Sequence, residues 1–278
     1  MSSTAGRPVA IGGVGGSGTR IVAKALSLLG YFIGDDLNEP LDNLWFTLLF
    51  KRRSVLVEPD SRFERLLRLF IGRMSGAIEL APKDLDLIFD LARQDRIQHS
   101  SAWLLERAQS FCHGRTAKEP DQPWGWKEPN THVVIERMRH FERELRYIHL
   151  VRHPLEMVTS ANQNQPNLWG PIFLDGQAES TPKLALSYWC AAHRRIDNFM
   201  SRNPGATLMV DYHRLCSTPE QHLAQIAEFL GAEASESSLQ KFRDFVSRPG
   251  DVRRFDGIDL GAFDRGDLEY VKKLGYET

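Results

Sequence analysis

A run of glycines near the N-terminus is the feature that most constrains the fold of this chain. It follows a short apolar run at residues 8–13 and precedes a helical pattern at 19–29. Glycine accepts positive φ angles, which let successive backbone N–H groups converge on one point. The N-terminus of the helix adds a partial positive charge there. A strand, a glycine loop and a helix in this order are typical of a parallel α/β sheet and predict a binding site for phosphate or sulfate.

The loop reads GGVGGSGTR over residues 12–20 and lacks two residues of a nucleotide triphosphatase. Such an enzyme carries GxxxxGK[ST], in which the lysine binds the β- and γ-phosphates and the hydroxyl binds magnesium. Counting from Gly13, Gly18 is in place, but Thr19 and Arg20 stand where Lys and Ser/Thr belong. ATP or GTP hydrolysis is therefore not expected, whereas metal-free binding of an anion is. The spacing does not fit a dinucleotide GxGxxG motif, and the alternative is a turn for tight helix–sheet packing.

Composition excludes several classes of protein. The 278 residues carry 35 Lys and Arg against 36 Asp and Glu, so no global basic field directs the chain to nucleic acid. Three cysteines without a CxxC pair fit neither a zinc site nor a disulfide framework and favour a reducing compartment. The longest apolar run, at 44–50, is too short to span a bilayer, and the N-terminus lacks the apolar stretch of a signal peptide. We expect a cytoplasmic protein with one domain over residues 1–278.

The rest of the chain alternates strands and helices. Further strands are predicted at 145–151 and 207–211, with Pro154 in the first turn of the helix that follows the earlier one. Helical spacing of apolar residues is found at 62–74, 83–93, 102–111, 183–203 and 219–230. The expected fold is α/β, a central parallel sheet flanked by helices, with a helical insertion roughly at 45–120 after the first βα unit.

Two further segments carry cations where the predicted sheet ends. Arg152 follows the strand at 145–151, and Ser160 lies eight residues on, in the predicted helix. An Arg, a hydroxyl and a helix N-terminus can bind one phosphate, although an Arg at this position is also a common salt-bridge residue. With the glycine loop, the pair predicts a ligand with two separate anionic groups.

The second segment reads WGWKEPNT at 124–131 and places Lys127 at the end of a short aromatic strand, with Thr131 as the expected helix cap. The alternative for this lysine is a solvated ion pair with Glu128. His132 and His153 stand beside the two segments, and each could equally be a hydrogen-bonded structural histidine.

Together these residues resemble the sulfotransferases that use 3′-phosphoadenosine-5′-phosphosulfate (PAPS). The loop is similar to the 5′-phosphosulfate loop of that family, Arg152 with Ser160 to its 3′-phosphate pair, and 126–129 to its KxP segment. The ends of the chain, at 210–212, 228–231 and 274–276, also resemble the late strand, helix and terminus of the family. The resemblance implies that Lys127 lies near the transferring sulfuryl group. It also implies a set of residues that bind the donor: Gly15, Gly16, Ser17, Gly18, Thr19, Arg20, Arg152 and Ser160.

One departure concerns the catalytic cation. Many sulfotransferases carry Lys or Arg directly before the SGT-type tripeptide, where this chain has Gly16. Lys127 is the candidate to replace it, with Arg20 or Lys24 as helpers. The turn at 251–257 contains Arg253 and Arg254 and resembles the segment of the family that closes over the nucleotide. The alternative interpretation is that these two arginines are only a solvated basic pair.

The acceptor hydroxyl needs a base, and the acidic segment at 34–42 follows the first helix. Glu39 before Pro40 is most similar to the base in several branches of the family, with Asp42 and Asp36 as alternatives. An acidic loop that only starts a helix is the other interpretation.

The implied reaction is metal-independent, in-line transfer from PAPS to a hydroxyl of a small-molecule, carbohydrate or lipid acceptor, with 3′-phosphoadenosine-5′-phosphate (PAP) as product. A divergent P-loop small-molecule kinase and a non-catalytic nucleotide-binding relative are the rival hypotheses. Aromatic residues in the insertion suggest either an apolar acceptor or ordinary core packing: Trp45, Phe46, Phe50, Phe63, Phe70 and Trp103.

Overall fold

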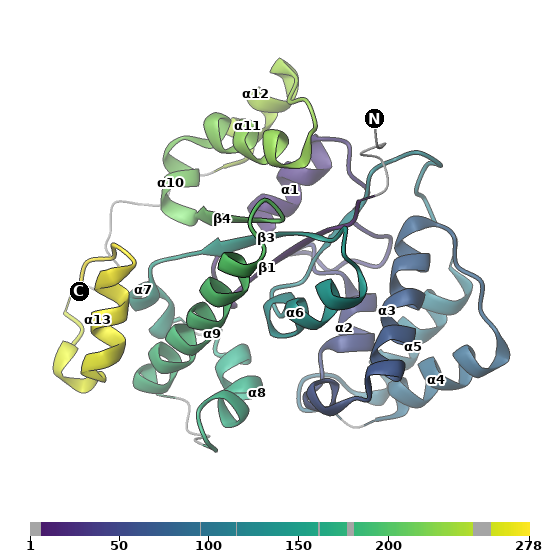
Figure 1. Ribbon diagram of the computed structural model, residues 1–278, viewed down its shortest axis with the longest axis horizontal. Helices are drawn as coiled ribbons and strands as arrows, with labels where there is room; N and C mark the ends of the chain where they lie inside the picture. The colour runs from purple at the N-terminus through teal and green to yellow at the C-terminus, as the bar shows by residue number, and fades with distance from the viewer. Residues whose placement is uncertain (1–6, 95, 115, 161, 177–180, 247–256) are drawn as a thin grey trace.

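The apolar run near the N-terminus forms a strand, β1, in which every residue is buried. The computed structural model describes residues 7–94, 96–114, 116–160, 162–176, 181–246 and 257–278. Within these residues four strands form one parallel sheet in the order β2-β1-β3-β4 (Figure 1). Their bounds are β1 Val9–Gly13, β2 Gly125–Lys127, β3 Arg146–Val151 and β4 Thr207–Asp211. The predicted α/β fold with a parallel sheet is confirmed.

Alternation along the strands divides the core into two faces. Val9 and Ile11 of β1 pack with Ile148 on one face, whereas Ala10 belongs to the cluster on the other face with Tyr147. Parallel register aligns the carboxyl ends of the strands: Gly13 of β1 pairs with Leu150 of β3, and Val151 of β3 with Asp211 of β4. The segments that follow β1, β3 and β4 therefore meet at one edge of the sheet.

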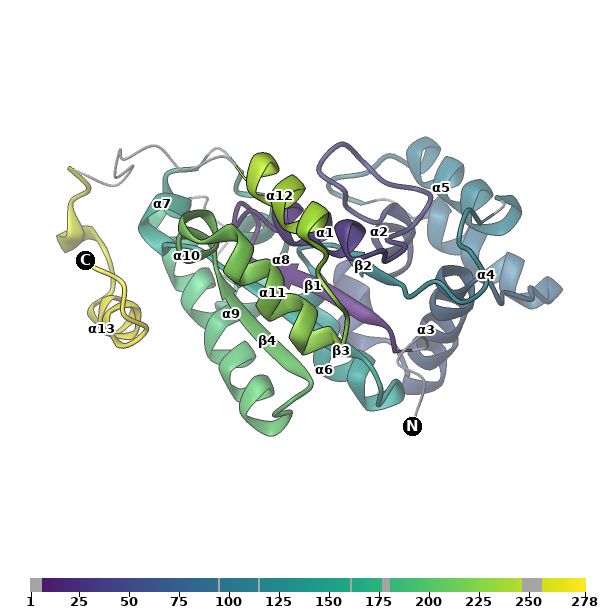
Figure 2. The same ribbon diagram turned by 90° about the horizontal axis from the view of Figure 1, so that it is seen from above.

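Helices cover both faces of the sheet. Figure 1 shows α1, α11 and α12 above the sheet and α6 and α9 below it. Figure 2 shows α13 standing apart from the sheet, beyond α9. The bounds outside the insertion are α1 Arg20–Leu28, α6 Thr131–Phe141, α7 Pro154–Val158, α8 Asn164–Phe173, α9 Pro182–Arg202, α10 Tyr212–Ser217, α11 Pro219–Leu230, α12 Glu236–Phe245, η3 Leu260–Ala262 and α13 Arg265–Lys273.

The insertion between α1 and β2 is helical, as predicted, and gathers on the β2 side of the sheet (Figure 2). Its aromatic residues are core: Phe46 packs edge-on against Phe70, and Phe70 against Trp126 of β2. Trp45, Phe50 and Phe63 are also fully buried, so core packing explains these five insertion aromatics. The elements are α2 Leu44–Phe50, η2 Arg53–Val57, α3 Asp60–Ser75, α4 Pro82–Arg93 and α5 Ser101–His113.

Two predicted local features are wrong. Thr131 does not cap α6 but is its first residue, because its buried hydroxyl accepts a hydrogen bond from the Trp126 indole at 3.3 Å. Ser160 does not lie in a helix, because α7 ends at Val158. The Gln163 amide donates to the carbonyl of Ser160 at 2.7 Å, and such local side-chain bonds compete with helix continuation.

Candidate active site

The glycine loop turns sharply between β1 and α1. Gly16 and Gly18 have φ angles of +92° and +90°, which other residues adopt only at a cost, and the Ser17 N–H donates to the Val14 carbonyl at 3.0 Å. The N–H groups of residues 18–20, at the start of α1, have no acceptor within the described residues. They are the donors that a helix N-terminus offers to an anion.

Two buried polar atoms beside this loop also have no hydrogen-bond partner in the described part of the chain. The first is the hydroxyl of Ser17, a residue only 1% exposed. The second is Oε1 of Gln165 in α8, whose Nε2 donates to the Gly13 carbonyl at 3.2 Å. Buried polar atoms are normally paired, so these two are suited to a polar ligand at the loop. Gln165 was not identified from the sequence.

The register of β1 and β3 brings Arg152 to the same loop. Its Nη1 donates to the Gly16 carbonyl at 3.3 Å, and its guanidinium lies 4.5 Å from the ring centroid of Tyr212. Tyr212 in turn covers Gly18, where an added Cβ would lie 2.6 Å from the ring. The structure therefore joins the two predicted anion sites and adds an aromatic residue that sequence reasoning missed.

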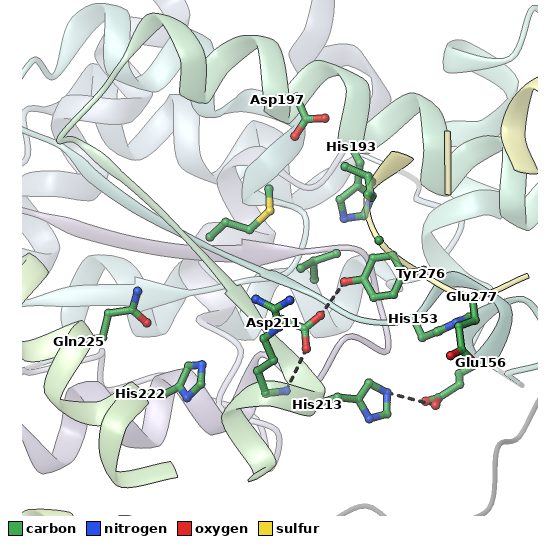
Figure 3. A pocket seen from close by; sticks show the side chains of 15 residues that line it. His153, Glu156, His193, Asp197, Asp211, His213, His222, Gln225, Tyr276 and Glu277 are labelled. Atoms are coloured by element: carbon green, nitrogen blue, oxygen red, sulfur yellow. Dashed lines mark hydrogen bonds and ion pairs between the residues drawn. The ribbon is translucent and has the colours of Figure 1, made fainter. Parts of the chain in front are cut away.

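Arg152 already has a carboxylate partner. Its Nε and Nη2 lie 2.8 and 2.7 Å from Oε2 of Glu156, and the other oxygen of Glu156 lies 3.1 Å from His213. Figure 3 shows the contact between His213 and Glu156 at one end of a cavity of about 620 Å³ at the carboxyl ends of β3 and β4. Tyr276, whose hydroxyl donates to Asp211 at 2.7 Å, lines the same cavity.

Lys127 lies at the end of β2, opposite Ile11 of β1 and so two residues before the loop begins to turn at Gly13. Its side chain is only 3% exposed, and its Nζ forms an ion pair with Asp42 and donates to the Pro40 carbonyl at 3.0 Å. The solvated ion pair with its chain neighbour is therefore not formed. The acidic segment after α1 instead surrounds this ammonium.

The three candidate carboxylates have different surroundings. Both oxygens of Asp42 are engaged, one by Lys127 and the other by the Asn38 amide at 2.9 Å. Asp36 lies 3.4 Å from the guanidinium of Arg107, and burial raises the pKa of its carboxyl. Glu39 is exposed and has no hydrogen bond or ion pair within the described residues.

The residue after Lys127 points elsewhere. Glu128 is 1% exposed and accepts hydrogen bonds from the backbone and side-chain amides of Asn130 at 2.5 and 2.9 Å. Its carboxylate also lies 3.6 Å from Lys51, and burial raises its pKa. The Asn130 side chain accepts from the Trp169 indole at 2.7 Å, which fastens α8 to this turn.

His132 has a structural environment. Its Nδ1 lies 2.8 Å from the Pro129 carbonyl and its Nε2 3.1 Å from the Tyr188 hydroxyl. Burial lowers its pKa to about 3, so the ring is neutral at physiological pH. The structural reading of this histidine is therefore supported.

The other predicted helpers have separate positions. Arg20 is exposed at the start of α1, and Lys24 lies 5.7 Å from the ring centroid of Phe245 in α12. Ser160 accepts a hydrogen bond from the Asn162 N–H at 3.2 Å in the turn after α7. The basic pair expected in the turn at 251–257, Arg253 and Arg254, lies outside the described residues.

The sequence profile of the sulfotransferase family matches residues 8–236, which include the loop, Lys127 and Arg152. The chain belongs to the sulfotransferase family. A comparison with curated proteins gives no match.

Solved sulfotransferases share the fold. A sulfotransferase domain from the curacin biosynthetic pathway is 18% identical over 98% of both chains, with a TM-score of 0.52. A sulfotransferase domain of the Synechococcus PCC 7002 olefin synthase is 18% identical over 98% of this chain and 95% of that one, with a TM-score of 0.50. Sulfotransferase STF9 from Mycobacterium avium is 16% identical over 96% of this chain and 76% of its own, also with a TM-score of 0.50. At these identities the likeness establishes the fold.

The described residues contain no helix with the length and apolar character needed to cross a bilayer. They also contain no group of three or more His, Cys, Asp or Glu side chains arranged to hold a metal ion.

Proposed function

We propose that this sulfotransferase moves the sulfuryl group of PAPS to a hydroxyl acceptor, within one domain over residues 1–278. The observation that carries the proposal is the meeting of unpaired donors in the glycine loop with Arg152. Such donors favour an anion without magnesium, and the absence of the phosphate-binding lysine and magnesium hydroxyl at Thr19 and Arg20 disfavours ATP chemistry. The cytoplasmic location expected from the sequence stays a prediction.

The donor would be held at two points. The loop N–H groups and the buried Ser17 hydroxyl would bind the 5′-phosphosulfate, with Gln165 as a further polar contact. Arg152 would bind the 3′-phosphate, with Ser160 beside it as the resemblance implies. Tyr212, which already contacts both Arg152 and Gly18, would orient that end of the nucleotide.

The transfer step divides between a cation and a base. A bond forms from the acceptor oxygen to sulfur, the bond from sulfur to the 5′-phosphate oxygen breaks, and PAP leaves with the electron pair. Lys127 would stabilise the negative charge that develops on that oxygen, in a site with little water. The acceptor proton would go to Glu39, because Asp42 has both oxygens engaged and so positions Lys127 instead.

Calorimetric titration with PAP, without magnesium, tests the donor site, with ATP plus magnesium as the control ligand. We expect PAP to bind without metal and the Arg152→Ala variant to bind it at least tenfold more weakly, because the 3′-phosphate loses its cation. Binding of ATP with magnesium but not of PAP would favour the divergent kinase. Tight PAP binding without transfer to any acceptor would favour the non-catalytic relative.

A further inference from the structure

A cavity of about 220 Å³ lies where α2 ends, apart from the nucleotide loop. Its described lining carries a concentration of positive charge and contains no Asp or Glu. The cationic and titratable residues of that lining are Lys51, Arg52, Arg53, Arg96 and His99. We call it the basic cavity.

Neutral carbonyl groups hold two of these cations in place. Arg96 donates to the carbonyls of Thr47 and Leu48, near the end of α2, at 2.9 and 2.7 Å. Arg53 donates to the carbonyl of Leu168 in α8 at 2.8 Å. These bonds fix the two guanidinium groups without neutralising them, and neither has a carboxylate partner within the described residues.

The other two cations have carboxylate partners. Lys51 lies 3.6 Å from the buried Glu128, and Arg52 lies 2.7 Å from Glu58, which also contacts Arg62 at 2.9 Å. The cavity therefore keeps an excess of positive charge over the acids that the structure describes around it. Of the two cations without a carboxylate partner among the described residues, Arg53 is exposed and Arg96 is half-buried, so an anionic ligand can reach both.

Three buried nitrogen atoms at the cavity have no hydrogen-bond partner within the described chain. They include Nη2 of Arg52, a residue only 5% exposed, Nε of Arg96 and Nε2 of His99. Burial and the neighbouring Arg52 lower the pKa of Arg96 to about 10. Burial, with Lys51 and Arg96, lowers the pKa of His99 to about 4. Burial is the larger cause of both pKa shifts, and the neighbouring cations add to it.

The basic cavity adjoins the proposed transfer site through two connections. Lys51 reaches Glu128, the chain neighbour of Lys127. Helix α8 contributes Leu168 to the cavity and, one turn earlier, Gln165 to the glycine loop. An acceptor that used both sites would run along α8.

We propose that the basic cavity binds an anionic group of the acceptor, so that the substrates are hydroxyl compounds that also carry a carboxylate, sulfate or phosphate. This inference rests on the proposed sulfuryl transfer. The exposed Ile97 at the cavity, 68% accessible, adds an apolar surface for the part of the acceptor next to that group.

The first test is direct anion binding. The full chain, with PAP added to fill the nucleotide loop, is titrated with inorganic sulfate by calorimetry. We expect Arg53→Gln and Arg96→Gln to weaken sulfate binding at least tenfold, and Arg62→Gln, which removes a neighbouring cation outside the cavity, to leave it within twofold. Arg53 is exposed and bonds only to backbone carbonyls, so its variant stays interpretable if the Arg96 variant unfolds. Absent binding, or equal binding in all four proteins, overturns the site.

The second test assigns the anion to the acceptor. A panel of hydroxy acids and their neutral amides is assayed with PAPS. We expect the kcat/KM of each accepted acid to exceed that of its amide at least tenfold. Arg53→Gln should reduce this ratio toward one. Equal turnover of acids and amides overturns the assignment while leaving the transferase intact. If PAP itself does not bind, the proposed function fails. The sulfate titration then still reports on the cavity, with Arg152→Ala identifying any sulfate held at the loop.

Discussion

Lys127 carries its charge where little water reaches it. The ammonium is compensated by Asp42 and by the Pro40 carbonyl, on a turn that the Asn38 side chain closes by accepting from the Asp42 N–H at 2.7 Å. Leu41 within this turn has a φ of +67°, an unusual value for a bulky residue. The lysine and the acidic segment thus form one unit, which residue types alone did not reveal.

Replacing this lysine separates catalysis from binding. Because Lys127 is proposed to act on charge that develops during transfer, Lys127→Met should lower kcat by about 10²–10³-fold and change PAP affinity less than threefold. Single-turnover transfer and PAP calorimetry measure the two quantities. Lys24→Met, at the lysine near Phe245, is the control and should retain activity. A parallel loss of affinity and activity would make Lys127 a binding residue.

Removal of the two carboxylates of the acidic segment should have different effects, one on kcat and the other on the free energy of unfolding. Glu39 is exposed and unpaired within the described residues, so Glu39→Gln should lower kcat by about 10²-fold without changing stability. Asp42→Asn leaves a buried cation without its partner and should lower the free energy of unfolding by about 3 kcal/mol. Urea unfolding and transfer assays on both variants test this; an active Glu39→Gln protein would require another base.

At the scale of elements, apolar periodicity predicted β3, β4 and α11 almost residue for residue. It could not predict α8, since Pro166 and Pro171 interrupt the helical pattern of that segment. Gln165 was missed for the same reason. Strand order depends on which edges pair in space, so the proximity of Arg152 to the glycine loop also required the structure.

The turn from β1 into α1 can be tested by comparing two glycines. Gly18 and Gly30 both have positive φ angles, but only a Cβ at Gly18 would meet the Tyr212 ring; one at Gly30 would have nothing within 4 Å. Gly30→Ala should lose about 1 kcal/mol of stability, and Gly18→Ala should lose more, because its Cβ also meets the Tyr212 ring. Only Gly18→Ala should also weaken PAP binding, at least tenfold, because it displaces Tyr212. Equal PAP affinities would remove Tyr212 from the proposed site.

Across the whole molecule, the face of the sheet covered by α9 buries a chain of polar rings. The Tyr147 hydroxyl lies 2.7 Å from Nδ1 of His149, whose Nε2 lies 3.3 Å from His193 of α9. Burial lowers the pKa of His193 to about 4 and that of His132 to about 3, and lowers that of His149 in the same direction. These histidines are thus neutral in the folded protein.

Stability should therefore fall in mild acid. Below the ordinary histidine pKa of about 6.5, the unfolded chain binds protons that the folded chain does not. Each buried histidine therefore lowers the free energy of unfolding by about 2 kcal/mol between pH 7 and pH 5. Urea unfolding at several pH values measures this slope. His193→Gln should reduce this slope by the amount that corresponds to about one proton taken up on unfolding. His140→Gln, at an exposed residue, should leave the slope unchanged. A flat profile would mean that these rings titrate normally.

The contact between Arg152 and Glu156 has a consequence for selectivity. A phosphate that approaches Arg152 must exchange places with a carboxylate that already holds two of its donors. The binding free energy that the phosphate contributes is then the difference between two interactions with Arg152, its own and that of the Glu156 carboxylate it displaces. Nucleotides with and without a 3′-phosphate would accordingly be told apart less sharply than a free arginine would allow, and Glu156 sets how much less.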